Sequence, residues 1–432
     1  MIEQPAGSLL SDTTLCRRST LADGATIISE RMDHVRSISL GVWVRTGSRD
    51  ESEAQAGITH MIEHMLFKGT PTRGAREIAL ALESLGGYLS AFTSEELTCY
   101  YAKFLDEHLS VAIEVLADIL ANSIIDEEEL AREKKVVAEE IKRFEDSPDK
   151  YAHYLLSKAL FDGHPLAIPI MGTLDSVASI SREDVYRSWR HRYTDDDIVI
   201  AASGHLDHDH LVDLASRSFK FFPSRVSSDG PPPPASTPRM ESACREISQI
   251  HMCLGARTRG YAHPDRYPLM ILNAIVGEGM SSRLFQRVRE QRGLVYTIYT
   301  FFHLNRDTGQ FGIYLATDPA QAREAMHVVA EECRHLLEEG LRQQELEHAK
   351  SQLKGGLMLA LEGTSARMMR LAETQIFLGT HITLDETIGA IDAVTEADVM
   401  RVAGHALGAE NLSAGVVGPL DTVELSLKEV QG

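Results

Sequence analysis

The sequence contains few cysteines, and none lies in a pattern that binds metal or forms a redox couple. Its five cysteines are odd in number and scattered, without a CxxC pair, which argues against a disulfide framework or a cysteine-rich zinc site. It lacks any run near the roughly 18 consecutive apolar residues that a membrane-spanning helix requires. The segment Met1 to Arg18 has no basic stretch followed by an apolar core, as a secretory signal would. We therefore expect a cytoplasmic protein with no membrane partner.

Positive charge is also scarce. Lys and Arg together number 43 against 63 Asp and Glu, so the formal net charge is −20. Proteins that bind nucleic acid neutralise phosphates with clustered basic side chains, so this composition argues against a nucleic-acid partner. The negative field would attract basic peptides, although an acidic surface also serves simple solubility.

The length of the chain and one proline run predict two domains. A chain of 432 residues is too long for one ordinary core, and its 43% apolar and 25% charged residues are typical of globular proteins. Four consecutive prolines at 231–234 favour an extended spacer and exclude a helix. We predict an N-terminal domain at 1–229, a Pro-rich linker at 230–239 and a C-terminal domain at 240–432.

The two halves resemble each other at an offset of about 210 to 216 residues. The paired segments are 39–45 with 249–256, 128–130 with 344–346, and 181–185 with 395–399. In each half, expected hairpins are followed by bunched helices, which is typical of an α+β sheet covered on one face. We therefore predict two homologous domains, each with a mostly antiparallel sheet covered on one face by helices.

A metal-binding motif lies in a helix expected over 57–67. His60, Glu63 and His64 have the form HxxEH, and residues three and four apart share one helix face. Zinc accepts imidazole nitrogen and carboxylate, and a catalytic site leaves one position for water. The alternative is a surface helix that happens to carry two histidines. The flanking residues are so apolar that most of the helix should be buried, and buried histidines beside a carboxylate need partners.

A third ligand is expected on another helix, predicted over 126–145. This segment offers Glu133, Glu139 and Glu140. Glu133 and Glu140 lie seven residues apart, on one stripe next to apolar side chains, whereas Glu139 points elsewhere. The periodicity alone does not choose between the first two, and part of the helix reads as an exposed charged surface.

Two segments carry a resemblance to a known family. GITHMIEHMLFKGT at 57–70 and EKKVVAEEIK at 133–142 resemble the pitrilysin-like (insulinase-like) zinc metallopeptidases, or inverzincins. The likeness is strongest to the bacterial processing-peptidase branch, which is similar to the mitochondrial processing peptidase β subunit. It extends from about Thr20 to Asp421.

The resemblance implies a role for each residue of the motif. His60, His64 and Glu140 would bind one zinc ion (Zn2+) per chain. Glu63 would act as the general base that takes a proton from water. Glu133 would support the site from the same helix as Glu140.

The resemblance also implies residues that bind the substrate. Ser90, Ala91 and Phe92 would form a sheet edge to which a peptide adds a strand through main-chain hydrogen bonds. Arg289 and Tyr296 would grip the peptide backbone beside the scissile bond, with Tyr296 as a donor to the oxyanion. Without the resemblance, the first three would be an ordinary edge hairpin and Arg289 a solvated helix residue.

The second half lacks the metal motif. At the repeat-equivalent positions it has Met270, Asn273 and Ala274, and Gly356 stands in place of Glu140. One active site per chain follows, and a duplicated unit with one metal-bearing copy suggests a clam-like chamber whose halves enclose a peptide.

The sequence thus predicts a zinc-dependent endopeptidase that hydrolyses extended peptides, unfolded or presequence-like. The resemblance implies a dimer, and because this chain keeps the metal motif, the base and the Arg289/Tyr296 pair together, a self-sufficient homodimer is the simpler prediction. The main alternative is a non-catalytic peptide-binding or regulatory subunit of a heterodimeric processing peptidase. A purely structural zinc site is the third possibility, but such sites close the fourth position with Cys or His, and none is placed to do so.

Overall fold

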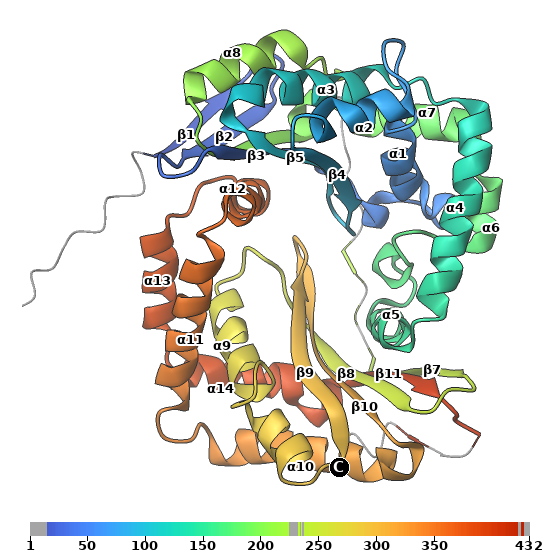
Figure 1. Ribbon diagram of the computed structural model, residues 1–432. Coiled ribbons are helices and arrows are strands. Elements are labelled where there is room, and N and C mark those ends of the chain that lie inside the picture. The colour runs from blue at the N-terminus through green and yellow to red at the C-terminus, as the bar shows by residue number, and fades with distance from the viewer. Residues whose placement is uncertain (1–14, 224–231, 234, 236, 422–424, 427–432) are drawn as a thin grey trace, which may run out of the picture.

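The computed structural model describes residues 15–223, 232–233, 235, 237–421 and 425–426. Figure 1 shows two β-sheets, one in the upper and one in the lower part of the view, each with helices beside it. The strands of the first sheet run in the order β1-β2-β6-β3-β5-β4. Their bounds are Cys16–Thr20 (β1), Thr26–Arg31 (β2), Ser37–Val44 (β3), Tyr88–Thr93 (β4), Thr98–Leu105 (β5) and Ile198–Gly204 (β6).

The second sheet repeats this arrangement without a counterpart of β1. Its order is β7-β11-β8-β10-β9. The bounds are Met240–Cys244 (β7), Ile250–Arg259 (β8), Val295–Leu304 (β9), Thr308–Thr317 (β10) and Ser413–Gly418 (β11). In both sheets one pair is parallel, β2 with β6 and β7 with β11, and the other pairs are antiparallel. The shared order and sense confirm two homologous, mostly antiparallel sheets in an α+β fold.

The helices follow the same duplication. In the first half they are Ile58–Leu66 (α1), Ala75–Glu83 (α2), Leu109–Asn122 (α3), Glu127–Glu145 (α4), Pro148–Phe161 (α5), Leu174–Ser179 (α6), Arg182–Arg192 (α7) and His208–Ser218 (α8). In the second half they are Arg266–Val276 (α9), Ala322–Glu339 (α10), Glu345–Ala360 (α11), Thr364–Leu378 (α12), Leu384–Ala393 (α13) and Glu396–Leu407 (α14). The helices expected over 57–67 and 126–145 are α1 and α4.

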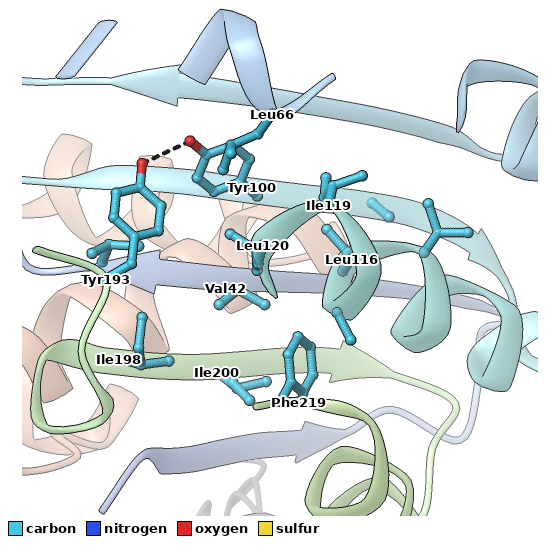
Figure 2. Packing of buried hydrophobic residues seen from close by; sticks show 14 of the residues in the cluster. Val42, Leu66, Tyr100, Leu116, Ile119, Leu120, Tyr193, Ile198, Ile200 and Phe219 are labelled. Carbon is cyan, nitrogen blue, oxygen red and sulfur yellow. Dashed lines mark hydrogen bonds between the residues drawn. The ribbon is translucent and has the colours of Figure 1, made fainter. Parts of the chain in front are cut away.

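The core of the first half lies between its sheet and its own helices. Figure 2 shows Val42 and Ile200 of the sheet facing Leu116 and Leu120 of α3, and a hydrogen bond of 2.7 Å joins the hydroxyl groups of Tyr100 and Tyr193. Strand β3 is buried at every position after its first residue. A strand buried on both faces reads as a continuous apolar run, so the opposite face of this sheet must also be covered.

A helix of the other half covers that opposite face in each sheet. Met368, Leu371 and Ala372 of α12 pack against Ile28 and Trp43 of the first sheet. In Figure 1, α12 lies directly beneath this sheet. The sequence did not indicate this exchange, because an amphipathic helix does not show which sheet it covers.

The exchange is reciprocal, because α5 packs on the second sheet. Leu155, Leu156 and Phe161 of α5 share a buried cluster with Cys253 of β8. The approach is close, since a Cβ built on Gly415 of β11 would lie only 2.5 Å from the carbonyl oxygen of Ala152. The two halves are therefore joined through apolar contacts as well as through the chain between them.

The predicted linker at 230–239 lies partly outside the described residues. Among the described residues, no single helix is long and apolar enough to cross a bilayer. The segments Asp106–Asn122 and Glu127–Glu145 reach that composition only as a pair, with a bend of 101° between them.

Candidate metal centre

Helix α1 begins at a backbone position that favours glycine. Gly57 precedes the helix in a left-handed conformation, with a φ of +89°, and as a glycine it has no side chain to cap the helix. The Glu51 carboxylate takes over that role, accepting hydrogen bonds of 2.7 Å from the N–H groups of Gly57 and Thr59. Burial raises the pKa of Glu51 to about 7, although the hydrogen bonds to Thr59 and Gly57 oppose the shift. The start of the metal helix is thus tied to the loop before it.

Three side chains from α1 and α4 meet at one point. Donor atoms of His60, His64 and Glu140 all lie within 4.8 Å of one another. The Glu140 Oε2 atom is 3.8 Å from His60 Nε2 and 3.6 Å from His64 Nε2. Within the described part of the chain, no fourth histidine, cysteine or acid joins this group.

The donor set fits zinc. Two imidazole nitrogens and one carboxylate oxygen form a catalytic zinc site when the fourth position stays available to water. Burial, with His64 nearby, lowers the pKa of His60 to about 4, so its imidazole is neutral near pH 7 and keeps a lone pair for a metal. The Nδ1 atom of His60 is buried without a hydrogen-bond partner among the described residues.

Glu133 contacts His64 at Nδ1, the ring nitrogen that does not face Glu140. Its Oε2 atom lies 2.9 Å from His64 Nδ1, and its Oε1 atom lies 2.6 Å from the Lys68 ammonium. Burial would raise the pKa of Glu133, but hydrogen bonds from Lys68 and His64 outweigh it and hold the pKa below its usual value. An ionised carboxylate here fixes which nitrogen of His64 faces the cluster, as is common behind metal-binding histidines.

Glu63 stands beside the cluster without belonging to it. Burial raises the pKa of Glu63, and a hydrogen bond from Thr93 partly opposes the shift. The Thr93 hydroxyl donates this bond to Glu63 Oε2 over 2.5 Å. A half-buried carboxylate with a raised pKa suits the exchange of protons with water.

The predicted substrate edge is an edge strand. Ser90, Ala91 and Phe92 belong to β4, which ends the order of the first sheet and pairs only with β5 among the described strands. All three residues are partly exposed. Because Thr93 ends the same strand and binds Glu63, this edge runs directly up to the metal centre.

The structure brings Arg289 and Tyr296 together in the second half. Arg289 lies in a π-helical segment, Phe285–Glu290, and Tyr296 is the second residue of β9, with 77% of its surface exposed. The Arg289 guanidinium stacks 4.6 Å from the Phe285 ring centre and 5.1 Å from that of Tyr296. Among the described residues, no hydrogen bond or ion pair joins this pair to His60, His64 or Glu140.

Three residues that touch the site were missed in the sequence. Lys68 lies four residues after His64, so helical spacing could have suggested it. Thr93 and Glu51 show no such signal, because each meets α1 only through the folding of a hairpin or a loop. In the second half, the Asn273 side chain donates to Glu278 over 2.9 Å, and no metal cluster forms there among the described residues.

Two models of one peptidase family match most of the chain. Residues 26–174 match the family model described as insulinase (peptidase family M16), and residues 179–353 match the model described as peptidase M16 inactive domain. The metal cluster lies wholly in the first of these matches, and the half without the motif lies largely in the second.

Curated relatives match almost the whole chain. A Bacillus subtilis protein named uncharacterized zinc protease YmxG is 40% identical over 407 residues, which cover 94% of this chain and 98% of the relative. The mitochondrial-processing peptidase subunit beta of Lentinula edodes is 31% identical over 425 residues, covering 93% and 90%. A solved protease from Helicobacter pylori shares the fold alone, with a TM-score of 0.85 at 21% identity over 94% of this chain and 99% of that one. The chain therefore belongs to peptidase family M16, the insulinase family.

Proposed function

We propose that this protein is a zinc-dependent endopeptidase that hydrolyses extended peptides, with one zinc ion held by His60, His64 and Glu140. One observation carries the proposal. Two imidazoles and a carboxylate from two helices converge beside a second, half-buried carboxylate, Glu63, which is bonded to the last residue of an edge strand. The relatives named zinc protease support it.

Each side chain has a distinct task in the proposed reaction. Zinc, when bound, supplies an activated water and polarises the scissile carbonyl. Glu63 takes a proton at its carboxylate and passes it to the leaving amine, and its raised pKa makes both transfers feasible. Glu133 keeps His64 in one orientation. Once the second half contacts the bound peptide, the Tyr296 hydroxyl donates to the oxyanion that forms at the scissile carbonyl.

The substrate class follows from the edge strand and the charge. A peptide that pairs with Ser90, Ala91 and Phe92 must be extended, and such pairing depends little on its side chains. The net charge of −20 favours basic peptides during encounter. Assembly as a homodimer and a cytoplasmic location stay predictions from the sequence.

The test combines zinc content with cleavage of an unstructured peptide. We expect Glu63→Gln to keep about one zinc per chain and to lose cleavage by roughly 10²- to 10⁴-fold, which is the usual contribution of a general base. Unchanged cleavage by this variant would rule out Glu63 as the base.

A matched pair on α4 tests the ligand. Glu140→Gln should lose zinc, whereas Glu139→Gln should retain it, because the Glu139 carboxylate points to solvent and pairs with Lys142 over 2.7 Å. Equal zinc binding by the two variants would contradict the ligand set. The alternative of a non-catalytic peptide-binding subunit predicts peptide binding without cleavage by the zinc-loaded wild type, even at high enzyme concentration.

A further inference from the structure

A group of charged side chains joins the two halves at the turn that follows the edge strand. The turn between β4 and β5 carries Glu95 and Glu96, and the turn between β9 and β10 carries Asp307. Arg49 lies between them with 1% of its side chain exposed. Its Nη1 atom is 2.5 Å from Glu96 Oε1, and its two Nη atoms each donate over 2.7 Å to Asp307.

Neighbouring contacts reinforce this junction. The backbone N–H of Arg306 donates to Glu96 Oε2 over 2.8 Å, and the Arg306 guanidinium lies 3.4 Å from Asp50. His303 Nε2 lies 3.3 Å from Glu95 Oε2. All of these contacts link the first half to residues of the β9–β10 hairpin, which in Figure 1 extends toward the first sheet.

The segment that carries Arg49 also contacts the two elements beside the metal centre, the β4–β5 turn and the start of α1. Arg49 belongs to the 3-10 turn Ser48–Asp50, whose backbone N–H groups bind the β4–β5 turn at Ser94 and Glu95. The next residue, Glu51, caps the start of α1. This short loop therefore sets the position of the metal helix relative to the end of β4.

Thr93 is the last link between the junction and the base. It ends β4 one residue before the turn, and its hydroxyl holds Glu63. The turn is tight, because the Ser94 N–H donates to the Leu97 carbonyl oxygen over 2.7 Å. A shift of Glu96 would consequently move Thr93, and a misplacement of a catalytic group by about 1 Å can lower the rate roughly a hundredfold.

We propose that Asp307 is a positioning residue for proteolysis: by clamping Arg49 onto Glu96, it holds the β4–β5 turn so that Thr93 keeps Glu63 oriented toward the metal centre. The second half would thus act on the reaction without contributing a metal ligand. A buried arginine requires a partner, and two carboxylates from different halves supply it here. The inference rests on the proposed function of Glu63.

A double-mutant cycle tests whether Asp307 acts through Thr93. Asp307→Asn, Thr93→Val and the double variant are compared on one fluorogenic peptide, with zinc content and near-ultraviolet circular dichroism as checks on the fold. Each single change should lower kcat about tenfold with little change in KM or zinc, because only the placement of the base is affected. The double variant should be no slower than Thr93→Val, since Asp307 then has nothing left to position.

Controls separate positioning from general damage. Thr93→Ser keeps the hydroxyl and should restore kcat. Glu241→Gln removes another carboxylate that bridges the halves, 3.0 Å from Lys158, but it touches nothing near the base and should leave kcat unchanged. If Asp307→Asn fails to fold, Arg49→Lys tests the same clamp with the same two outcomes, because it keeps the positive charge but loses the pair of Nη donors to Asp307.

The outcomes are decisive in both directions. The inference is overturned if the two single effects on kcat multiply, so that the double variant is slowed about a hundredfold. It is also overturned if kcat is unchanged in Asp307→Asn. Cleavage retained by Glu63→Gln would instead overturn the proposed function itself. An inactive Glu63→Gln with multiplied effects in the cycle therefore rejects only the role of Asp307.

Discussion

Removal of the Glu133 carboxylate offers a sharp test of the metal centre that does not depend on activity. This side chain is 8% exposed and binds two partners, His64 Nδ1 at 2.9 Å and the Lys68 ammonium at 2.6 Å. Glu133→Ala leaves the ring N–H of His64 without an acceptor and leaves Lys68, only 26% exposed, without a counter-charge. Both losses disfavour the arrangement that a metal needs.

The expected magnitude follows from the bond that is lost. A hydrogen bond to a charged group contributes about 1.5–3 kcal/mol, and changes behind a metal-binding histidine commonly weaken metal affinity about 10–100-fold. We expect the dissociation constant for zinc to rise within that range in Glu133→Ala. Glu133→Gln keeps an acceptor for His64, so its zinc affinity should fall less, by about tenfold, at the lower end of that range. Lys68→Met should weaken zinc binding by a similar amount.

The assay is competition between the metal-free protein and a chromophoric chelator at neutral pH. The order wild type, then Glu133→Gln, then Glu133→Ala should appear in the zinc dissociation constants, while thermal melting shows that each variant is folded. Zinc binding by Glu133→Ala as tight as by the wild type would refute the reasoning, because His64 would then need no support from α4.

Three further predictions concern stability. Burial raises the pKa of Glu51 from 4.5 to about 7 in the folded protein. The protonated side chain therefore contributes about 3 kcal/mol to the free energy of unfolding below pH 4.5, and this contribution is lost as the pH rises through 7. The free energy of unfolding of Glu51→Gln, measured in urea, should lack that part of the pH dependence. Gly57→Ala should lower the free energy of unfolding by more than about 2 kcal/mol, since its Cβ would lie 2.5 Å from the Met171 carbonyl oxygen. Gly86→Ala, also at positive φ but with open space around it, should lower it by about 1 kcal/mol. Equal losses in urea unfolding would contradict the steric argument. Leu371→Ala should cost about 2–5 kcal/mol, and calorimetry should still show one transition, because α12 covers the sheet of the other half; two separate transitions would show that the halves are stable independently.

Much of the fold could be predicted because its signals are local. The helical spacing of HxxEH placed His60, Glu63 and His64 on one helix, and α1 has nearly the expected bounds. The internal repeat predicted two similar sheets, and both have the same strand order. The exchange of α5 and α12 was not foreseen, because hydrophobic periodicity shows that a helix is covered without showing by what.

Glu133 and Glu140 of α4 show what helical spacing predicts and what depends on the tertiary structure. The seven-residue spacing put Glu133 and Glu140 on one stripe, and only the resemblance to a known family separated their roles. In the structure, Glu140 reaches the Nε2 atoms of both histidines, whereas Glu133 reaches the opposite ring nitrogen of His64. The difference depends on how α4 crosses α1, which no periodicity within α4 encodes.

The sequence by itself determined the elements and the side chains that can bind a metal, since these depend on residues close together in the chain. It also determined the duplication, since similar segments recur at an offset of about 210 to 216 residues. Only the tertiary structure decided the surroundings of those side chains: the bond from Thr93 to Glu63, the Lys68 partner of Glu133, and the clamp of Asp307 on Arg49 across 258 residues of chain. Burial, pKa and orientation arise from groups that meet after folding, and long-range contacts of this kind leave no periodic trace in a single sequence.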